Sequence, residues 1–435
     1  MEDPKTSYRT KRYLTGIDWV VNAVDYASKA QSGIGNHSEI VLELENPPQL
    51  RTLQEALNRF IRKFPVLAGY PSRALNLCPY WKIPPVEQTP GLRLQIEQVD
   101  DDSQCLSSLA NQVNAAFRNR GEHLVFILVH SGGKSFLGMV FDHRLLDAKG
   151  AEALLHLFQQ FYRGEDHLQV SLTHPAHLNQ WIEKFRAGRQ LNRFLLKLTK
   201  EPLRVLPFDG RKEPCKFKVV SFNPDQSARL TAAAYASAGY LMFLPYALAK
   251  SIQIIHRSFE KKGIPGATYL IPVPMDTRSK EEARKESLFN HFSFFVFKID
   301  SSKTGDLNAL LAEIKKQMYE QVKNKIPEAI INASCLMRIA SLPVTNFFLK
   351  LMSKKHFASF SFSYLNNAYQ ENRFMQAKVL NIFHLPRTPK PPGIGIFFNQ
   401  FDNKLNVTLS YFEDLLSEEE AEQIIKSLEA LGNEE

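Results

Sequence analysis

The sequence predicts an α/β protein with mixed sheets. Strand patterns alternate with helical patterns along the 435-residue chain, hairpin signals interrupt that alternation in both halves, and no short-period repeat is present. Apolar residues make up 44% and charged residues 23%, close to the averages of globular chains, which excludes wholesale disorder, a collagen-like repeat and a disulfide scaffold. The length suits two to three domains, or two halves around a shared cleft.

Period-two and helical patterns define the first half of the chain. Residues 38 to 45 alternate so that three aliphatic side chains share one face of a strand, and apolar residues at helical spacing follow until Pro65 ends that helix. Two apolar runs joined by residues 131 to 134 predict a hairpin. The other elements expected here are strands at 80–83, 92–98, 124–129 and 136–141 and helices at 103–117 and 150–162.

A connector at residues 164 to 213 separates the halves. Between Glu183 and Arg204 seven side chains are basic and two acidic, mixed with Leu and Phe, which predicts a helix with a solvated basic face packed across the two halves. Beyond it we expect strands at 217–222, 269–274, 292–299, 357–365, 379–384, 394–400 and 404–411, the last two forming a hairpin, and helices at 225–237, 244–259, most of 304–354 and 417–431.

The charge balance favours anionic partners. Lys and Arg outnumber Asp and Glu by 54 to 45, giving a net charge of +9, which suits phosphorylated cofactors, acidic carrier proteins or anionic lipid as well as a generally basic soluble protein. No motif supports nucleic-acid binding. The 31 Phe residues indicate either thick apolar layers or a tunnel for an apolar substrate. Residues 342 to 355 could form a membrane-surface helix, but the pattern favours a core-facing helix end.

The location expected for the chain is cytoplasmic. The four cysteines lie far apart and read as reduced thiols, and the charged N-terminus lacks the apolar region of a signal peptide. No apolar stretch is long enough to span a bilayer. His174 and His177 are separated by a proline and have no evident third partner, so we expect surface histidines and no metal site.

His143 and Asp147 are the leading candidates for chemistry. An H-x-x-x-D pattern arises often by chance, but this one closes an apolar strand and opens a helix, a junction at which a short loop is held rigidly. An imidazole that titrates near neutrality suits proton transfer. The alternative is a turn histidine whose ring bonds to the backbone, with Asp147 as the N-cap of the following helix.

Several segments, in order, carry a resemblance that covers nearly the whole chain. They resemble the chloramphenicol-acetyltransferase-like superfamily of CoA-dependent acyltransferases, which includes condensation domains of peptide synthetases, wax-ester synthases and alcohol acyltransferases. The segments are 59–70 (RFIRKFPVLAGY), 141–147 (FDHRLLD), 274–278 (PMDTR), 289–293 (FNHFS), 362–366 (FSYLN) and the hairpin at 391–393 (PPG) leading to 405–409 (LNVTL).

The resemblance implies two similar lobes with an active-site tunnel between them. The implied division is an N-terminal lobe at residues 1–185, a basic connector at 186–213 and a C-terminal lobe at 214–435. One end of the tunnel would admit an acyl thioester and the other an acceptor. No permanently bound cofactor is implied, because coenzyme A or a carrier-bound phosphopantetheine acts as co-substrate.

The resemblance also implies roles for single residues. His143 would be the general base, and Asp147 would pair with Arg278 in a bidentate ion pair that holds the loop in shape. Asn290 would lie beside the tunnel, and Ser363 would be an oxyanion donor. The family usually reads H-H-x-x-x-D-G, but Asp142 and Ala148 replace the first His and the Gly. Asp142 would raise the pKa of His143 if it lay close, and the lost Gly matters if φ is positive there.

The function implied is acyl transfer to a hydroxyl or amine acceptor, without a metal. The abundance of Phe favours a lipidic acyl chain or acceptor, with contact to a membrane surface as one option. Two alternatives stay open: a non-catalytic relative that uses the tunnel for binding, and a condensation-type enzyme that acts only on carrier-bound substrates.

Overall fold

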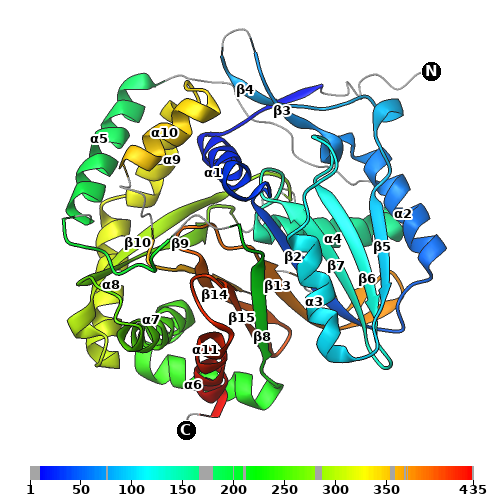
Figure 1. The fold of residues 1–435 in the computed structure, drawn as a ribbon. Coiled ribbons are helices and arrows are strands. Elements are labelled where there is room, and N and C mark those ends of the chain that lie inside the picture. The colour runs from blue at the N-terminus through cyan, green and yellow to red at the C-terminus, as the bar shows by residue number, and fades with distance from the viewer. Residues whose placement is uncertain are drawn as a thin grey trace.

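The computed structural model describes residues 10–74, 77–165, 180–198, 200–208, 212–279, 287–352, 358–366, 369 and 371–433. Its helices and strands form two sheet-rich lobes, which confirms the expected mixed α/β organisation (Figure 1). His174 and His177 lie outside the described residues.

The first lobe is built on a six-stranded sheet. The strands, in spatial order, are β12 (Arg373–Phe374), β13 (Ala377–Pro386), β2 (His37–Glu45), β7 (Ser135–Asp142), β6 (Leu124–His130) and β5 (Arg93–Gln98). Neighbours are antiparallel except β5 and β6, and the hairpin predicted for β6 and β7 is confirmed. Helices α2 (Leu50–Lys63) and α4 (Ala148–Tyr162) bury their apolar sides with the aliphatic face of β2, and α3 (Asp102–Val113) covers the other face.

The second lobe contains a four-stranded and a two-stranded sheet. The larger has the order β11 (Ser361–Leu365), β14 (Ile394–Phe401), β15 (Lys404–Phe412) and β8 (Cys215–Ser221), and the smaller pairs β9 (Thr268–Asp276) with β10 (Phe292–Asp300). The hairpin predicted around residues 402 and 403 joins β14 and β15. The helices of this lobe are α6 (Pro224–Ala238), α7 (Phe243–Lys261), α8 (Leu307–Lys323) and α11 (Glu418–Ala430).

The second half of the chain also contributes to the first lobe. β13 pairs antiparallel with β2 along most of its length, so residues 373 to 386 complete the six-stranded sheet. This exchange ties the two halves of the chain together through the backbone hydrogen bonds of the sheet. The division of the chain at residues 185 and 213 stays a prediction.

The sequence analysis did not predict the N-terminal helix. α1 (Gly16–Ser32) begins with a capping box in which Thr15 and Asp18 bond to each other's backbone nitrogen. Its buried face carries Asp18, Asn22 and Asp25 among apolar residues, which masks the helical periodicity. The short strands β1 (Lys11–Tyr13), β3 (Tyr70–Arg73) and β4 (Pro79–Lys82) form a separate three-stranded sheet next to it.

Three helices lie along one side of the molecule (Figure 1). α5 (Trp181–Leu198) is the helix predicted in the basic connector and packs against α9 (Ile326–Met337), while α10 (Leu342–Met352) packs against α1. Among the described residues, none of the helices taken singly has both the length and the apolar character to cross a bilayer; α6 and α7, bent by 95°, meet those criteria only as a pair.

Candidate active site

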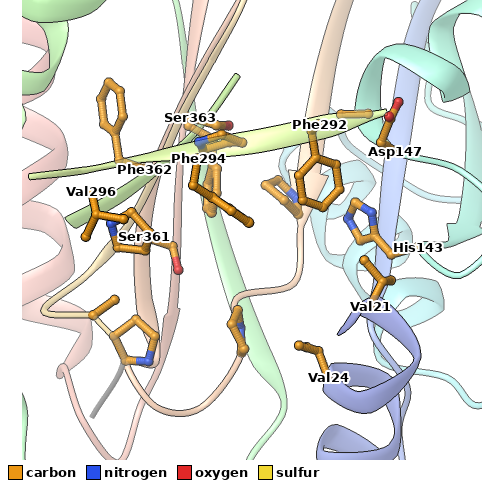
Figure 2. Close-up of a pocket in the computed structure, with 18 of the residues that line it drawn as sticks. Val21, Val24, His143, Asp147, Phe292, Phe294, Val296, Ser361, Phe362 and Ser363 are labelled. Atoms are coloured by element: carbon orange, nitrogen blue, oxygen red, sulfur yellow. The ribbon is translucent and has the colours of Figure 1, made fainter. Parts of the chain in front are cut away.

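A cavity of about 1930 Å³ lies between the two lobes. Its wall combines α1 and the ends of β2 and β7 with β9, β10 and β11 (Figure 2). Pockets for a single small molecule usually measure about 300 to 1,000 Å³. The cavity therefore has room for two substrates at once.

Strand β7 delivers His143 to the wall of this cavity. All eight residues of β7 are buried, and the chain leaves the sheet directly after Asp142. The backbone N–H of His143 donates to the carbonyl of Asn36 at 3.0 Å, and Asp147 then caps α4 by accepting from the N–H of Gly150 at 2.7 Å. The turn is thus fixed by a backbone hydrogen bond at its start and by a side-chain-to-backbone hydrogen bond at its end.

The ring of His143 has a defined tautomer. Nδ1 lies 3.1 Å from the carbonyl oxygen of Leu146, which can only accept, so Nδ1 carries the proton. In the neutral ring Nε2 then has a free lone pair, to which the hydroxyl of Ser38 donates at 2.9 Å. Phe141 packs edge-on against the ring at 5.2 Å. The two interpretations of His143, as a catalytic base and as a turn histidine bonded to the backbone, are therefore compatible. The bond from Nδ1 to the backbone leaves Nε2 unprotonated.

Burial lowers the pKa of His143 below its ordinary value. The carboxylates of Asp147 and Asp142 act in the opposite direction, but the loss of solvent around the ring outweighs them. Asp142 thus raises the pKa of His143 as expected, but its contribution is smaller than the effect of burial. A lowered pKa keeps the ring neutral, as a base requires.

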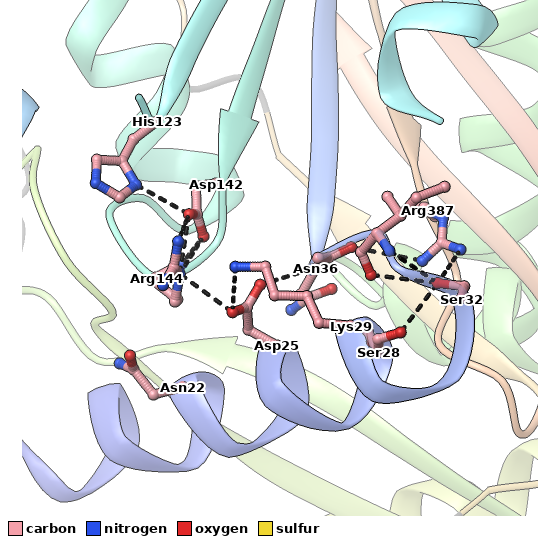
Figure 3. A network of polar contacts seen from close by, with 12 residues as sticks. Asn22, Asp25, Ser28, Lys29, Ser32, Asn36, His123, Asp142, Arg144 and Arg387 are labelled. Atoms are coloured by element: carbon pink, nitrogen blue, oxygen red, sulfur yellow. Dashed lines mark hydrogen bonds and ion pairs between the residues drawn. The ribbon is translucent and has the colours of Figure 1, made fainter. Parts of the chain in front are cut away.

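Asp142 belongs to a polar network with His123, Arg144 and Asp25 (Figure 3). One of its oxygens contacts Nδ1 of His123 at 2.9 Å, and Arg144 bonds both oxygens and also contacts Asp25 of α1 at 3.4 Å. Burial by itself would raise the pKa of Asp142, but Arg144 and His123 hold it well below its usual range. The carboxylate that replaces the family's first histidine thus anchors the turn to α1.

Arg278 lies against Asp147, with a geometry that differs from the expected one. Its Nη2 is 2.9 Å from both carboxylate oxygens of Asp147, while Nη1 bonds Asp276 at 3.0 Å. The predicted bidentate pair is therefore wrong in detail, because the guanidinium is shared between two carboxylates. The second oxygen of Asp147 also accepts from the N–H of His291 at 2.9 Å. These contacts join the His143 turn to the loops that end β9 and begin β10.

The substitution of Gly by Ala148 causes no strain. Ala148 is the first residue of α4 and its φ is not positive, so the backbone there does not need a glycine. The close approach occurs at Gly150, where a Cβ atom would lie 2.4 Å from the carbonyl oxygen of Ser287. Of the two departures from the family pattern, neither distorts the turn.

Asn290 lies behind His143 and does not itself line the cavity, whereas its neighbour His291 does. Its side-chain amide donates to the backbone carbonyl of His143 at 3.0 Å, and its backbone N–H donates to Asp18 at 3.0 Å. Asp18 in turn forms a buried ion pair with Arg12 at 2.9 Å. Asn290 therefore links the His143 turn to α1.

Ser363 lies on the cavity wall across from His143 (Figure 2). It belongs to β11 together with Ser361, which shares its side of the strand and also lines the cavity. Apolar side chains surround them, including Phe294 and Val296 of β10. The cavity thus has a polar turn on one side and hydroxyls in an apolar wall on the other.

Three residues of the site escaped the sequence analysis: Ser38, Asp18 and His291. Ser38 lies on the same face of β2 as three aliphatic residues. A polar residue in that row was the one sign in the sequence that Ser38 has a special role. Asp18 had a signal in its capping-box spacing from Thr15. His291 directly follows Asn290 and lines the cavity. The pairing of Ser38 with His143 spans 105 residues and depends on β2 lying beside β7.

Comparisons with known proteins place the fold. No protein-family model matches the sequence, and no curated protein matches it. Solved structures do match over nearly their full length. The first condensation domain of the calcium-dependent antibiotic synthetase, bound to a substrate analogue, has a TM-score of 0.71 at 12% identity and covers 98% of this chain and 96% of its own.

Two further structures agree. A trichothecene 15-O-acetyltransferase from Fusarium sporotrichioides has a TM-score of 0.70 at 13% identity, covering 99% of this chain and 97% of its own. The epimerization domain of the third module of tyrocidine synthetase B has a TM-score of 0.63 at 13% identity, covering 97% and 96%. The chain therefore shares the two-lobed fold of these condensation and epimerization domains and of the acetyltransferase.

Proposed function

We propose that this protein transfers an acyl group from a thioester of coenzyme A, or of a carrier protein, to a hydroxyl or amine acceptor. The observation that carries the proposal is the His143 ring, whose protonated Nδ1 is fixed on Leu146 while Nε2 lies at a two-substrate cavity. The fold is shared with condensation domains and with an acetyltransferase, which supports the same reaction class.

The reaction follows from this geometry. Nε2 of His143 removes the proton of the acceptor as its oxygen or nitrogen attacks the thioester carbonyl. A tetrahedral intermediate forms, the C–S bond breaks, and the imidazolium returns its proton to the departing thiolate. Ser363 donates a hydrogen bond to the oxyanion, since it is a hydroxyl on the wall across from the base. Before the acceptor binds, Ser38 occupies the lone pair of Nε2.

The cavity favours apolar substrates. Its wall near the base includes Val21 and Val24 of α1, and Phe292 lies beside the His143 ring (Figure 2). Burying each methylene group of an acyl chain contributes about 0.8 kcal/mol. We therefore assign a lipidic acyl chain or a lipidic acceptor to this cavity.

The test is acceptor-dependent release of free thiol from acyl-CoAs of increasing length, with mixed alcohols and amines as acceptors. Wild type is compared with His143→Ala, and His130→Ala serves as control because that ring lies on β6 and bonds Ser135. We expect His143→Ala to lose about 10²–10⁴-fold of the turnover, with an unchanged melting temperature, and His130→Ala to keep it. Activity of His143→Ala within a few-fold of wild type would contradict the proposal.

A carrier-bound donor distinguishes the alternatives. Turnover with a phosphopantetheinylated carrier thioester but not with acyl-CoA would identify a condensation-type enzyme. Substrate binding without turnover from either donor would identify a binding module. Because the fold is shared with condensation domains, the experiment has to include the carrier-bound donor.

A further inference from the structure

Helix α5 presents large apolar side chains to solvent. Ile182 is 68%, Phe185 57% and Leu196 58% exposed. The opposite side of the helix is held against the protein, where Ala187 and Leu198 are buried. A helix that is apolar on its solvent side as well as on its packed side lacks a partner on that outer side.

Helix α10 adds a second set of exposed apolar residues. Phe347 is 62%, Phe348 52% and Val344 44% exposed, and the two phenylalanine rings contact each other edge-on at 5.7 Å. Both helices lie on the same side of the molecule in Figure 1. We call the exposed residues of α5 and α10 together the α5–α10 face.

The charges of this face are mainly positive. The exposed cations of α5 are Arg186, Arg189, Arg193 and Lys197, none of which forms an ion pair with a described acidic residue. The helix contains one acidic residue, Glu183. Basic residues interleaved with Phe, Ile and Leu along one helix are typical of segments that lie on an anionic bilayer.

The face adjoins the cavity. Asn192 and Leu196 of α5 are exposed to solvent and also line the cavity, and Asn346 of α10 lines it next to Phe347. A substrate that leaves a bilayer at this face would therefore reach the cavity without crossing water. His143 lines the same cavity from its other side.

We propose that the α5–α10 face binds an anionic lipid bilayer and that a membrane-resident lipid enters the cavity there as acyl acceptor. Binding to the bilayer stands on the exposed residues alone, whereas the lipid's role as acceptor rests on the proposed acyl transfer. An acidic carrier protein would complement the basic residues of α5. It would not account for the two phenylalanines of α10, which are more than half exposed. Burial of such apolar side chains in the membrane interface is favourable.

The binding test uses sedimentation with vesicles of phosphatidylcholine alone or with an equal amount of phosphatidylglycerol. We expect the intact protein to bind the anionic vesicles and to be released by salt. Arg189→Glu with Arg193→Glu should weaken the partition at least tenfold, since each basic residue near an anionic surface contributes to it. The matched control is Arg59→Glu with Arg62→Glu, the same charge change on α2 on the opposite side of the molecule (Figure 1), and should bind as wild type.

A second pair of variants tests the apolar part. Phe347→Ser should reduce binding several-fold, whereas Tyr240→Ser, which removes an even more exposed ring elsewhere, should not. Equal binding by wild type and the α5 charge variant would overturn the proposal. So would absence of vesicle binding combined with capture of an acidic carrier protein that the α5 charge variant loses.

The two proposals fail in different ways. Turnover of water-soluble acceptors without vesicle binding would reject the bilayer site and leave acyl transfer in place. Vesicle binding lost in the α5 charge variant, with no turnover of any donor, would keep the bilayer site and reject acyl transfer. If both hold, the α5 charge variant should keep its turnover of soluble acceptors and lose that of vesicle-borne ones.

Discussion

The two sides of the cavity differ in how tightly their polar groups are held. In the turn at residues 142–147, both oxygens of Asp142 and of Asp147 are bonded, both ring nitrogens of His143 have partners, and even its backbone carbonyl accepts from Asn290. On the facing strand β11, Ser361 and Ser363 line the cavity with no side-chain hydrogen bond to another described residue.

This difference indicates a division of labour. A base has to be held within a fraction of an ångström of its working position, and a shell of hydrogen bonds achieves that before substrate arrives. Hydroxyls without protein partners are free to reorient toward a ligand oxygen. In the proposed reaction, the side of the cavity that carries the base is therefore rigid, and the side that faces the thioester carbonyl can adapt.

Removing Arg278 is the strongest way to break the rigid side. Arg278→Ala leaves the carboxylates of Asp147 and Asp276 without their shared guanidinium, and Arg278 and Asp147 are both nearly inaccessible. We expect a loss of about 3–5 kcal/mol in the free energy of unfolding, measured by denaturant titration, with a parallel loss of turnover.

Two variants calibrate that effect. Arg278→Lys keeps the positive charge but loses the planar guanidinium that reaches both carboxylates. Its free energy of unfolding and its turnover should therefore lie between those of wild type and of Arg278→Ala. Arg163→Ala breaks the exposed pair with Glu371 and should cost less than about 1 kcal/mol. If Arg278→Ala unfolds like the Arg163 variant and keeps its activity, the turn does not depend on Arg278.

Removing a single hydroxyl tests the adaptable side. Ser363→Ala should lower kcat by about 10²-fold with little change in stability, because the oxyanion loses a donor that no folded-state contact requires. Ser361→Ala, two residues away on the same strand, is the matched variant and should retain most of the activity. A reversed order of the two variants would move the donor to Ser361, and wild-type rates in both would remove β11 from the chemistry.

The pH dependence of the rate sharpens the comparison further. The proposed reaction requires the base form of His143, and burial lowers the pKa of that ring below its ordinary value of about 6.5. The acidic limb of the kcat/KM profile should therefore lie below that pH. An acidic limb above it would mean that another group titrates, or that the ring is solvated in the working enzyme.

The local elements of the fold could be predicted from the sequence where one face is apolar. The hairpins β6–β7 and β14–β15 and the helix α4 followed from periodicity and turn residues, because those signals are local. Helix α1 could not be found that way, since its buried face carries Asp18, Asn22 and Asp25. Asp18 and Asp25 bind residues from other parts of the chain, which local periodicity does not reveal.

The sequence by itself determined the strand–turn–helix junction that carries His143 and Asp147, because the end of a buried strand and an N-cap are encoded by adjacent residues. Only the tertiary structure decided the rest of the site. In the folded protein Ser38 bonds to Nε2 of His143, and Asn290 bonds to the backbone of the turn. Arg278 forms ion pairs with both Asp147 and Asp276. These contacts join residues more than a hundred positions apart or depend on loop geometry, and strand pairing between distant segments brings them together.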